Sequence, residues 1–341
     1  MRLNVNNKYG AINAVKTILA CLIAYVLGNL QVYIFDFQSK YIWMIVTILV
    51  VMSTQPNVGG VVNKALMRFL GTFVGAVTSI LIILFGVSSI SDYILVLCLL
   101  FIFVFIAGVY PKYSYAGFLA ALTVAIINFN GDISVSIALS RVSEIIQGIA
   151  IALVVNRYVY PITAEVRIKD NYIESLNKLK DLFGFLSHID KKDYRKKSDS
   201  MVSLYIKQTV LLKELAFEKD DVTHYRNLHH AFMKIYRYTG AIRDYVNILI
   251  ERNGACFDIG TLRFQNKCRE VLDLFAKSIQ DNIKIDSSEM NDFDEYLSKI
   301  SEEIDENLSD NDNVIINNYL KIFQQAIQDF YTEYNLLISN K

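Results

Sequence analysis

Residues 65–85 read ALMRFLGTFVGAVTSILIILF, and Arg68 is the only charged side chain among them. A helix needs about 20 mostly apolar residues to cross the hydrocarbon core of a bilayer. A helix on the surface of a soluble protein keeps one polar face, and this stretch has none. The stretch therefore predicts a membrane-spanning helix, and with it an integral membrane protein.

Further apolar stretches lie in the first 161 residues. They cover approximately residues 11–28, 39–54, 92–110, 112–129 and 137–160. The stretches at 39–54 and 112–129 are the shortest. The first is expected to remain in the protein, because no small-residue cleavage site of a secretory signal follows it. Together with residues 65–85, these stretches predict about six transmembrane helices.

Charge divides the chain into two parts. Residues 1–161 hold 9 Lys/Arg and 4 Asp/Glu, whereas residues 162–341 hold 25 and 30. In the second part apolar residues recur at steps of three and four, as in the seam of Tyr172, Leu176, Leu179, Phe183 and Leu186, which is typical of amphipathic helices. We predict an all-α protein with a six-span transmembrane domain over residues 1–161 and a cytoplasmic α-helical domain, a bundle of five or six helices, over residues 162–341.

Basic residues beside the spans predict the orientation, because positively charged loops stay in the cytoplasm. One set of loops and the N-terminus carry Arg2, Lys8, Lys64, Arg68, Lys112, Arg157, Arg167 and Lys169. The other set carries Lys40, opposed by Asp36, Asp92 and Asp132. We therefore expect a multi-pass protein of the cytoplasmic (inner) membrane with both termini in the cytoplasm.

Ionisable side chains inside the spans are costly, at about 2.5–3.5 kcal/mol each on insertion scales. Arg141, Glu144 and Gln147 are spaced i, i+3, i+6 and form one polar stripe on the last span. Two readings are open. In one, Arg141 and Glu144 form an ion pair that helps the helix pack; in the other, the stripe lines a solute path, with Arg141 meeting an anion and Glu144 balancing charge or carrying a proton. Lys16 and Arg68 either extend to the headgroups or join that path.

Small residues mark the third span as a packing helix. Gly71, Thr72 and Gly75 form a small-xxx-small face, which lets helices approach closely. Before it, the segment 55–60, QPNVGG, predicts a flexible turn into a helix start. Free N–H groups at that start, with Arg68 nearby, are suited to hold a carboxylate.

A series of motifs runs through residues 10–165. They are Ala14-Val-Lys16-Thr-x-x-Ala20, Tyr41-Ile-Trp43-x-x-x-Thr47, Gln55-Pro56-x-x-Gly59, Arg68-x-x-Gly71-Thr72-x-x-Gly75, Tyr115-x-Gly117-Phe118 with Thr123, and Arg141-x-x-Glu144-x-x-x-Gly148. In these motifs the chain resembles membrane proteins of the fusaric acid resistance and aromatic acid exporter type, often labelled FUSC. Plant anion channels of the aluminium-activated malate transporter type are distantly similar. Both resemblances imply movement of organic anions.

The resemblance also bears on assembly. Larger exporters of this type hold two six-span halves in one chain, and this chain has one. A homodimer with a two-fold axis is the simplest way to complete the unit.

Together these observations predict an exporter of small, aromatic organic anions. A carboxylate would meet Arg141, Arg68 or Lys16, and an aromatic ring would meet Trp43 or Tyr41. No phosphate-binding loop is present, so transport would use an ion gradient, with the proton as the coupling ion, or be passive. The solute itself is not specified by these residues.

Two other functions compete with export by a carrier. A passive organic-anion channel would differ in following membrane voltage. A membrane-anchored helical scaffold or sensor would bind a protein partner and move no solute.

The sequence gives no support for other classes of protein function. No nucleophile constellation, metal spacing or phosphate loop predicts an enzyme or a cofactor. His224, His229 and His230 are close in sequence, but neighbouring helix positions point about 100° apart and no cysteine joins them, so no metal site is predicted. The balanced charge and the lack of a basic stripe predict no nucleic-acid partner.

Overall fold

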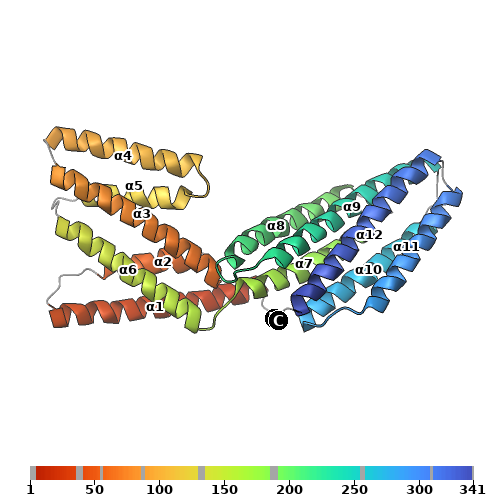
Figure 1. Ribbon diagram of the computed structural model, residues 1–341, viewed down its shortest axis with the longest axis horizontal. Helices are drawn as coiled ribbons and strands as arrows, with labels where there is room; N and C mark the ends of the chain where they lie inside the picture. The colour runs from red at the N-terminus through yellow and green to blue at the C-terminus, as the bar shows by residue number, and fades with distance from the viewer. Residues whose placement is uncertain are drawn as a thin grey trace. The chain divides into compact units, whose positions relative to one another are not determined.

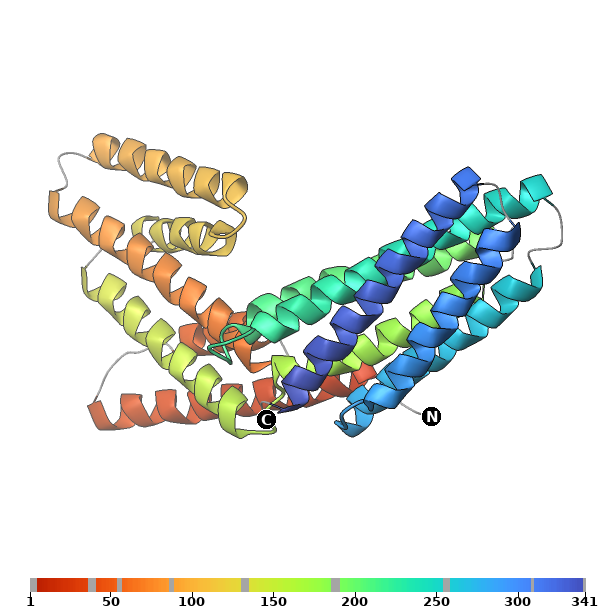
Figure 2. The same ribbon diagram turned by 45° about the vertical axis from the view of Figure 1, so that its right-hand side comes forward.

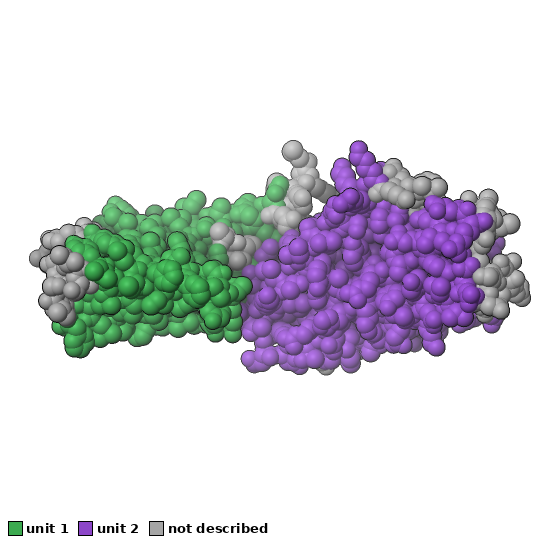
Figure 3. Space-filling view, turned by 90° about the horizontal axis from the view of Figure 1, so that it is seen from above, with its two compact units in different colours: residues 1–164 green, residues 165–341 purple. Residues whose placement is uncertain are grey.

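The computed structural model of the protein describes residues 5–35, 41–53, 57–85, 89–129, 135–184, 191–253, 258–307 and 310–339. These residues form twelve α-helices and contain no strand, so the predicted all-α class is confirmed. The chain divides into two compact units, residues 1–164 and 165–341, coloured separately in Figure 3. The division lies close to Pro161, after which the charge of the sequence rises.

Unit 1, residues 1–164, is built from the apolar stretches. Its helices are α1 (Val5–Phe35), α2 (Ile42–Met52), α3 (Val58–Phe85), α4 (Ser89–Val109), α5 (Ser114–Asn128) and α6 (Val135–Tyr158), labelled in Figure 1. Among the described residues, three segments are long and apolar enough to cross a membrane, namely Asn7–Ile34, Val58–Phe85 and Ala138–Tyr158. The segments Ile42–Met52, Tyr93–Val109 and Ser114–Asn128 are apolar but shorter. The number of crossings therefore stays a prediction.

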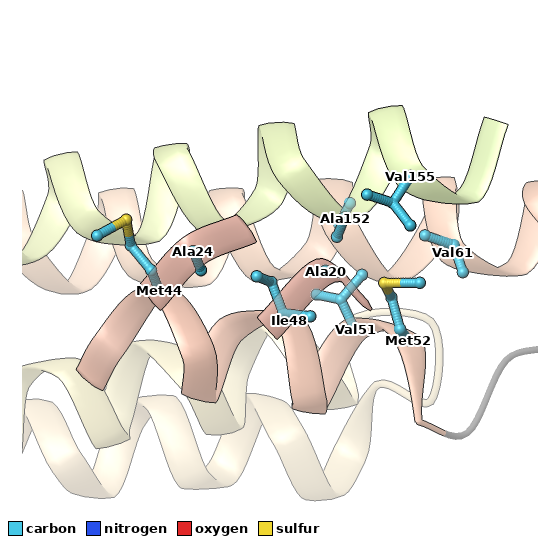
Figure 4. Packing of buried hydrophobic residues seen from close by; sticks show 10 residues of the cluster. Ala20, Ala24, Met44, Ile48, Val51, Met52, Val61, Ala152 and Val155 are labelled. Atoms are coloured by element: carbon cyan, nitrogen blue, oxygen red, sulfur yellow. The ribbon is translucent and has the colours of Figure 1, made fainter. Parts of the chain in front are cut away.

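Helix α2 is short. Of the predicted stretch 39–54, only 11 of the described residues are helical. At about 1.5 Å per residue it covers roughly 17 Å, well short of the ~30 Å hydrocarbon core. One face of it is instead covered by protein. Met44, Ile48, Val51 and Met52 are fully buried against alanines and valines of α1, α3 and α6, as Figure 4 shows. The apolar side chains of Ile42 and Leu49 stay exposed, which suits contact with lipid.

Two glycines bring α3 and α5 into backbone contact. A Cβ atom on Gly71 would lie 2.4 Å from the carbonyl oxygen of Ala116, and one on Gly75 would lie 2.7 Å from that of Ala120. Thr72, between them, is buried. Helix α5 in turn contacts α4 at Gly117, where an added Cβ would lie 2.9 Å from the carbonyl oxygen of Phe103. The small residues therefore set how closely these three helices pack.

Unit 2, residues 165–341, contains the amphipathic helices. They are α7 (Ala164–Phe183), α8 (Lys191–Leu215), α9 (Thr223–Asn253), α10 (Asp258–Asp281), α11 (Ser287–Asn307) and α12 (Asp310–Ser339). Helices α9 and α12 pack along their lengths, as Figure 2 shows.

The core of unit 2 is aromatic. The rings of Phe275 and Phe330 stack with centroids 4.9 Å apart, and Tyr172 meets Phe232 edge to face at 5.8 Å. Four members of the predicted seam, from Tyr172 to Phe183, are buried, and Leu186 lies outside the described residues. The steps of three and four in the sequence thus correspond to the buried faces of these helices.

Candidate functional site

A recess inside unit 1 collects polar side chains from three helices. Trp43 comes from α2, Arg68 from α3 and Arg141 from α6. An apolar wall completes it, made of Leu119, Leu122, Thr123, Ile126 and Ile127 from α5 and Ile145 from α6. Three of the residues predicted to meet a solute, far apart in the sequence, therefore line one recess.

Arg141 lies against the ring of Trp43. Its guanidinium carbon is 4.5 Å from the ring centroid, within the range of a cation–π contact. The Nη1 atom of Arg141 is nevertheless buried and donates no hydrogen bond among the described residues. The contact orients the guanidinium while leaving one of its donors unused.

Arg68 is also incompletely bonded. Its side chain is only 3% exposed, so it lies inside unit 1 and not at its surface. Nη2 is 3.5 Å from Oγ1 of the fully buried Thr47, a long hydrogen bond, and the buried Nε has no partner among the described residues. A buried donor without an acceptor costs about 1–3 kcal/mol. The hydroxyl of Tyr115 on α5 also interacts with the guanidinium of Arg68. Arg68 and Arg141 thus line one recess with one unused donor each.

Glu144 moderates the charge of the recess. It is 3% exposed, lies three residues after Arg141 on α6 and attracts it electrostatically. Gly148, one turn further, packs so closely on α2 that an added Cβ would lie 2.8 Å from the carbonyl oxygen of Met44. Residues i and i+4 share a helix face, so Glu144 is on the α2 side of α6. Two guanidiniums and one carboxylate leave the region with a net positive charge.

The recess is narrow in this conformation. It has room for about one water molecule between the side chains. A solute the size of an aromatic acid would therefore have to displace side chains.

The other predicted site residues lie elsewhere. Gln147 accepts a hydrogen bond of 2.8 Å from Nε2 of Gln31 on α1, and donates one to Ser143. Tyr41 precedes α2 and meets Tyr25 edge to face at 5.3 Å. Neither lines the recess. Both instead connect α1 to its neighbouring helices.

Lys16 is buried at the end of α6. Its ammonium donates to Oδ1 of Asn156 at 2.5 Å and lies 3.3 Å from the carbonyl oxygen of the same residue. It is not among the residues that line the recess. With 1% of its surface exposed, it does not extend outward as a snorkelling lysine would.

The predicted turn before α3 is described only in part. Gln55 and Pro56 lie outside the described residues, and Gly59 and Gly60 are buried in the first turn of α3. The N–H of Val58 donates to the carbonyl oxygen of Ile162 at 3.0 Å. One of the amides expected to hold a carboxylate is thus bonded within the protein.

The histidines of unit 2 have separate protein partners. Nδ1 of His229 lies 3.0 Å from Oε1 of Gln208, its ring stacks on Tyr205, and burial, aided by the nearby His230, lowers its pKa to about 4. His224 contacts Glu333 at 2.7 Å. In the described part of the chain no three His, Cys, Asp or Glu residues group as a metal site would require.

Sequence reasoning gave no role to three buried polar residues of unit 1. Thr47 accepts the hydrogen bond from Arg68, Asn156 accepts the one from Lys16, and Asn13 donates to the carbonyl oxygen of Met52 at 2.8 Å. The signal was present, since each is a polar residue within an apolar helix. Which partner each one has depends on how the helices pack.

Comparison with known proteins identifies the family. Residues 11–326 of the 341 match the model of the FUSC family, described as the fusaric acid resistance protein family. The chain therefore belongs to this family, as the resemblance of its motifs indicated. The family is one of membrane proteins with transport or efflux function and not a family of enzymes. No curated protein gave a significant match to the sequence.

Proposed function

We propose that this member of the fusaric acid resistance protein family exports small organic anions, aromatic carboxylates among them, across the cytoplasmic membrane. One observation carries the proposal. Arg68 and Arg141, on different helices, line the same recess, and each has one buried N–H donor without an acceptor among the described residues. An anion would supply those acceptors, and charge-assisted hydrogen bonds from guanidinium to carboxylate are the strong ones.

The arrangement also favours an aromatic solute. With its carboxylate between the two guanidiniums, a ring would meet the indole of Trp43 or the apolar wall that includes Leu119 and Ile126. Aromatic rings gain about 0.5–1.5 kcal/mol beyond area burial when they pair. Trp43 would exchange its contact with Arg141 for one with the solute ring.

The membrane arrangement is part of the same proposal. All six helices of unit 1 would lie within the membrane, with one face of α2 covered at partial depth by α1, α3 and α6. Both termini and unit 2 would lie in the cytoplasm, as the basic loops predict. Two chains would pair to complete a twelve-helix unit. Cysteine accessibility on the two sides of intact cells tests the topology, and cross-linking in the membrane tests the pairing.

Reconstituted vesicles test the function. Purified protein in proteoliposomes should exchange labelled benzoate, a simple aromatic carboxylate, and Arg141→Gln or Arg68→Gln should reduce the rate by at least about tenfold, since a charge-assisted hydrogen bond is worth about 1.5–3 kcal/mol. Arg157→Gln is the matched control, because Arg157 is an exposed arginine on the same helix as Arg141. Equal rates in all variants would remove the recess from the mechanism.

Two further measurements separate the competing functions. Voltage-dependent current carried by the anion across a planar bilayer would identify a channel. Absence of any flux, together with capture of one defined protein by the full-length chain, would identify a scaffold or sensor.

A further inference from the structure

Lys16 places its own positively charged ammonium at the end of helix α6. Its ammonium lies 2.5 Å from Oδ1 of Asn156, 3.3 Å from the carbonyl oxygen of Asn156 and 3.5 Å from that of Tyr160. These groups form the last turn of α6 and the residues just after it, where a helix carries partial negative charge. The lysine therefore caps the C-terminal end of the helix that presents Arg141 and Glu144.

No described carboxylate of unit 1 is paired with this ammonium. Glu144 is the only acidic residue of unit 1 whose side chain the structure describes, and it lies twelve residues before Asn156, roughly 18 Å along the axis of α6. No described charged group acts electrostatically on Lys16.

The helices that pack against Lys16 offer no counter-ion either. Helix α2 has no titratable side chain, and Arg157 and Tyr158 of α6 are exposed. The other titratable groups of α1 are Lys8, Tyr9, Cys21, Tyr25 and Tyr33, and those of α3 are Lys64 and Arg68, none of them acidic carboxylates. Among the described residues of unit 1, the ammonium is thus compensated by neutral oxygens, and its charge can change without breaking an ion pair within that set.

The end of a second helix meets the same face of α1. Asn13, three residues before Lys16, donates from Nδ2 to the carbonyl oxygen of Met52 at the end of α2, at 2.8 Å. Its Oδ1 is buried without a partner among the described residues, as is Nδ2 of Asn156. Carbonyl oxygens at the ends of helices within a membrane are a setting in which transporters bind coupling cations.

We propose that Lys16 is the proton-coupling site of the transporter. Its Nζ–H bond breaks and the proton passes to water on one side of the membrane; the neutral amine later takes a proton from water on the other side. The pKa of a lysine shifts readily when the side chain is buried, which suits a group that gains and loses a proton. The neutral amine attracts the negative end of α6 less strongly, so loss of the proton loosens the helix that carries Arg141 and Ile145 of the recess. This inference rests on the proposed transport of anions.

Glu144, the other titratable group inside unit 1 considered as a proton carrier, is less suited. It is one turn from Arg141, with which it interacts electrostatically. A change in its charge would alter the anion site directly, whereas Lys16 acts on that site from the far end of the same helix.

The sole tryptophan provides a test that does not depend on transport. Trp43 lines the recess, so its fluorescence in the purified protein without substrate should change with pH in the wild type and in Glu144→Gln, and should be independent of pH in Lys16→Met. Two results would overturn coupling at Lys16. One is wild-type fluorescence that does not change with pH, and the other is a pH-dependent change that persists in Lys16→Met.

Transport assays supply the second test. In proteoliposomes, Lys16→Arg keeps a charged cap that does not titrate, so benzoate counterflow without a gradient should stay near the wild-type rate while uptake driven by a pH gradient falls by at least about tenfold. Lys112→Met, at an exposed lysine outside the recess, should leave both assays unchanged.

The outcomes distinguish the two proposals. Gradient-driven uptake that survives in Lys16→Arg, or loss of both activities in a correctly folded Lys16→Arg protein, contradicts coupling at Lys16. If the wild-type protein shows no benzoate counterflow, the proposed function is contradicted, and the coupling proposal fails with it.

Discussion

The guanidinium of Arg141 lies 4.5 Å from the ring centroid of Trp43, although the two residues are about a hundred positions apart in the sequence. This contact joins the polar stripe of α6 to the partly buried helix α2. It also places the only tryptophan of the protein at the recess where we expect the solute.

Ligand binding at the recess should therefore be visible in the fluorescence of Trp43. Titration with benzoate should change the emission of the wild type, and Arg141→Gln should weaken the apparent affinity by at least about tenfold through loss of a charge-assisted hydrogen bond. Arg157→Gln, at the exposed end of α6, should bind as the wild type does. An emission change that survives unaltered in Arg141→Gln would place binding elsewhere.

Arg68 should be required as a guanidinium and not only as a charge. Arg68→Lys keeps the charge but loses the planar set of donors, of which Nε is unused and Nη2 faces Thr47. We expect roughly a tenfold loss of benzoate affinity in Arg68→Lys and a larger loss in Arg68→Gln, measured by the same titration. Full affinity in Arg68→Lys would mean that charge alone suffices.

A methyl group added at Gly75 should destabilise unit 1. The new Cβ would lie 2.7 Å from the carbonyl oxygen of Ala120, so α3 and α5 would have to move apart. We expect Gly75→Ala to cost about 1–3 kcal/mol, as overpacking typically does, and to lower the thermal midpoint in detergent. Gly108→Ala is the matched control, because nothing lies within 4 Å of its Cβ position. Similar midpoints for the two variants would argue against close packing of α3 on α5.

His229 should make unit 2 sensitive to acid. Burial lowers the pKa of its imidazole to about 4, below the value of about 6.5 in an unfolded chain. The unfolded state then binds the proton more readily, so stability is unaffected above pH ~6.5 and declines as the pH falls from there towards 4, by up to roughly 3 kcal/mol.

The thermal midpoint of the full-length protein as a function of pH measures this effect. His229→Gln should show a flatter decline, whereas His230→Gln, which removes only the smaller cause of the lowered pKa, should stay closer to the wild type. A decline of the same steepness in His229→Gln would assign the acid sensitivity to other groups.

The sequence by itself determined the helical class, the change in character near Pro161 and the family. These properties follow from local features, because hydrophobic length and the period of 3.6 residues act within one segment. The motifs around Trp43, Arg68 and Arg141 were visible for the same reason. The sequence did not reveal that α2 is too short to cross a membrane unaided and is covered on one face by other helices.

Only the tertiary structure decided which polar residues meet. It joined Trp43, Arg68 and Arg141 at one recess, and it placed Lys16 at the end of α6 with Asn156 and left Tyr41 and Gln147 against α1. A charged residue in an apolar helix predicts that some partner exists, since its burial is costly. The identity of that partner depends on the packing of helices distant in sequence, where close glycine contacts such as those of Gly71 and Gly148 fix which side chains face one another.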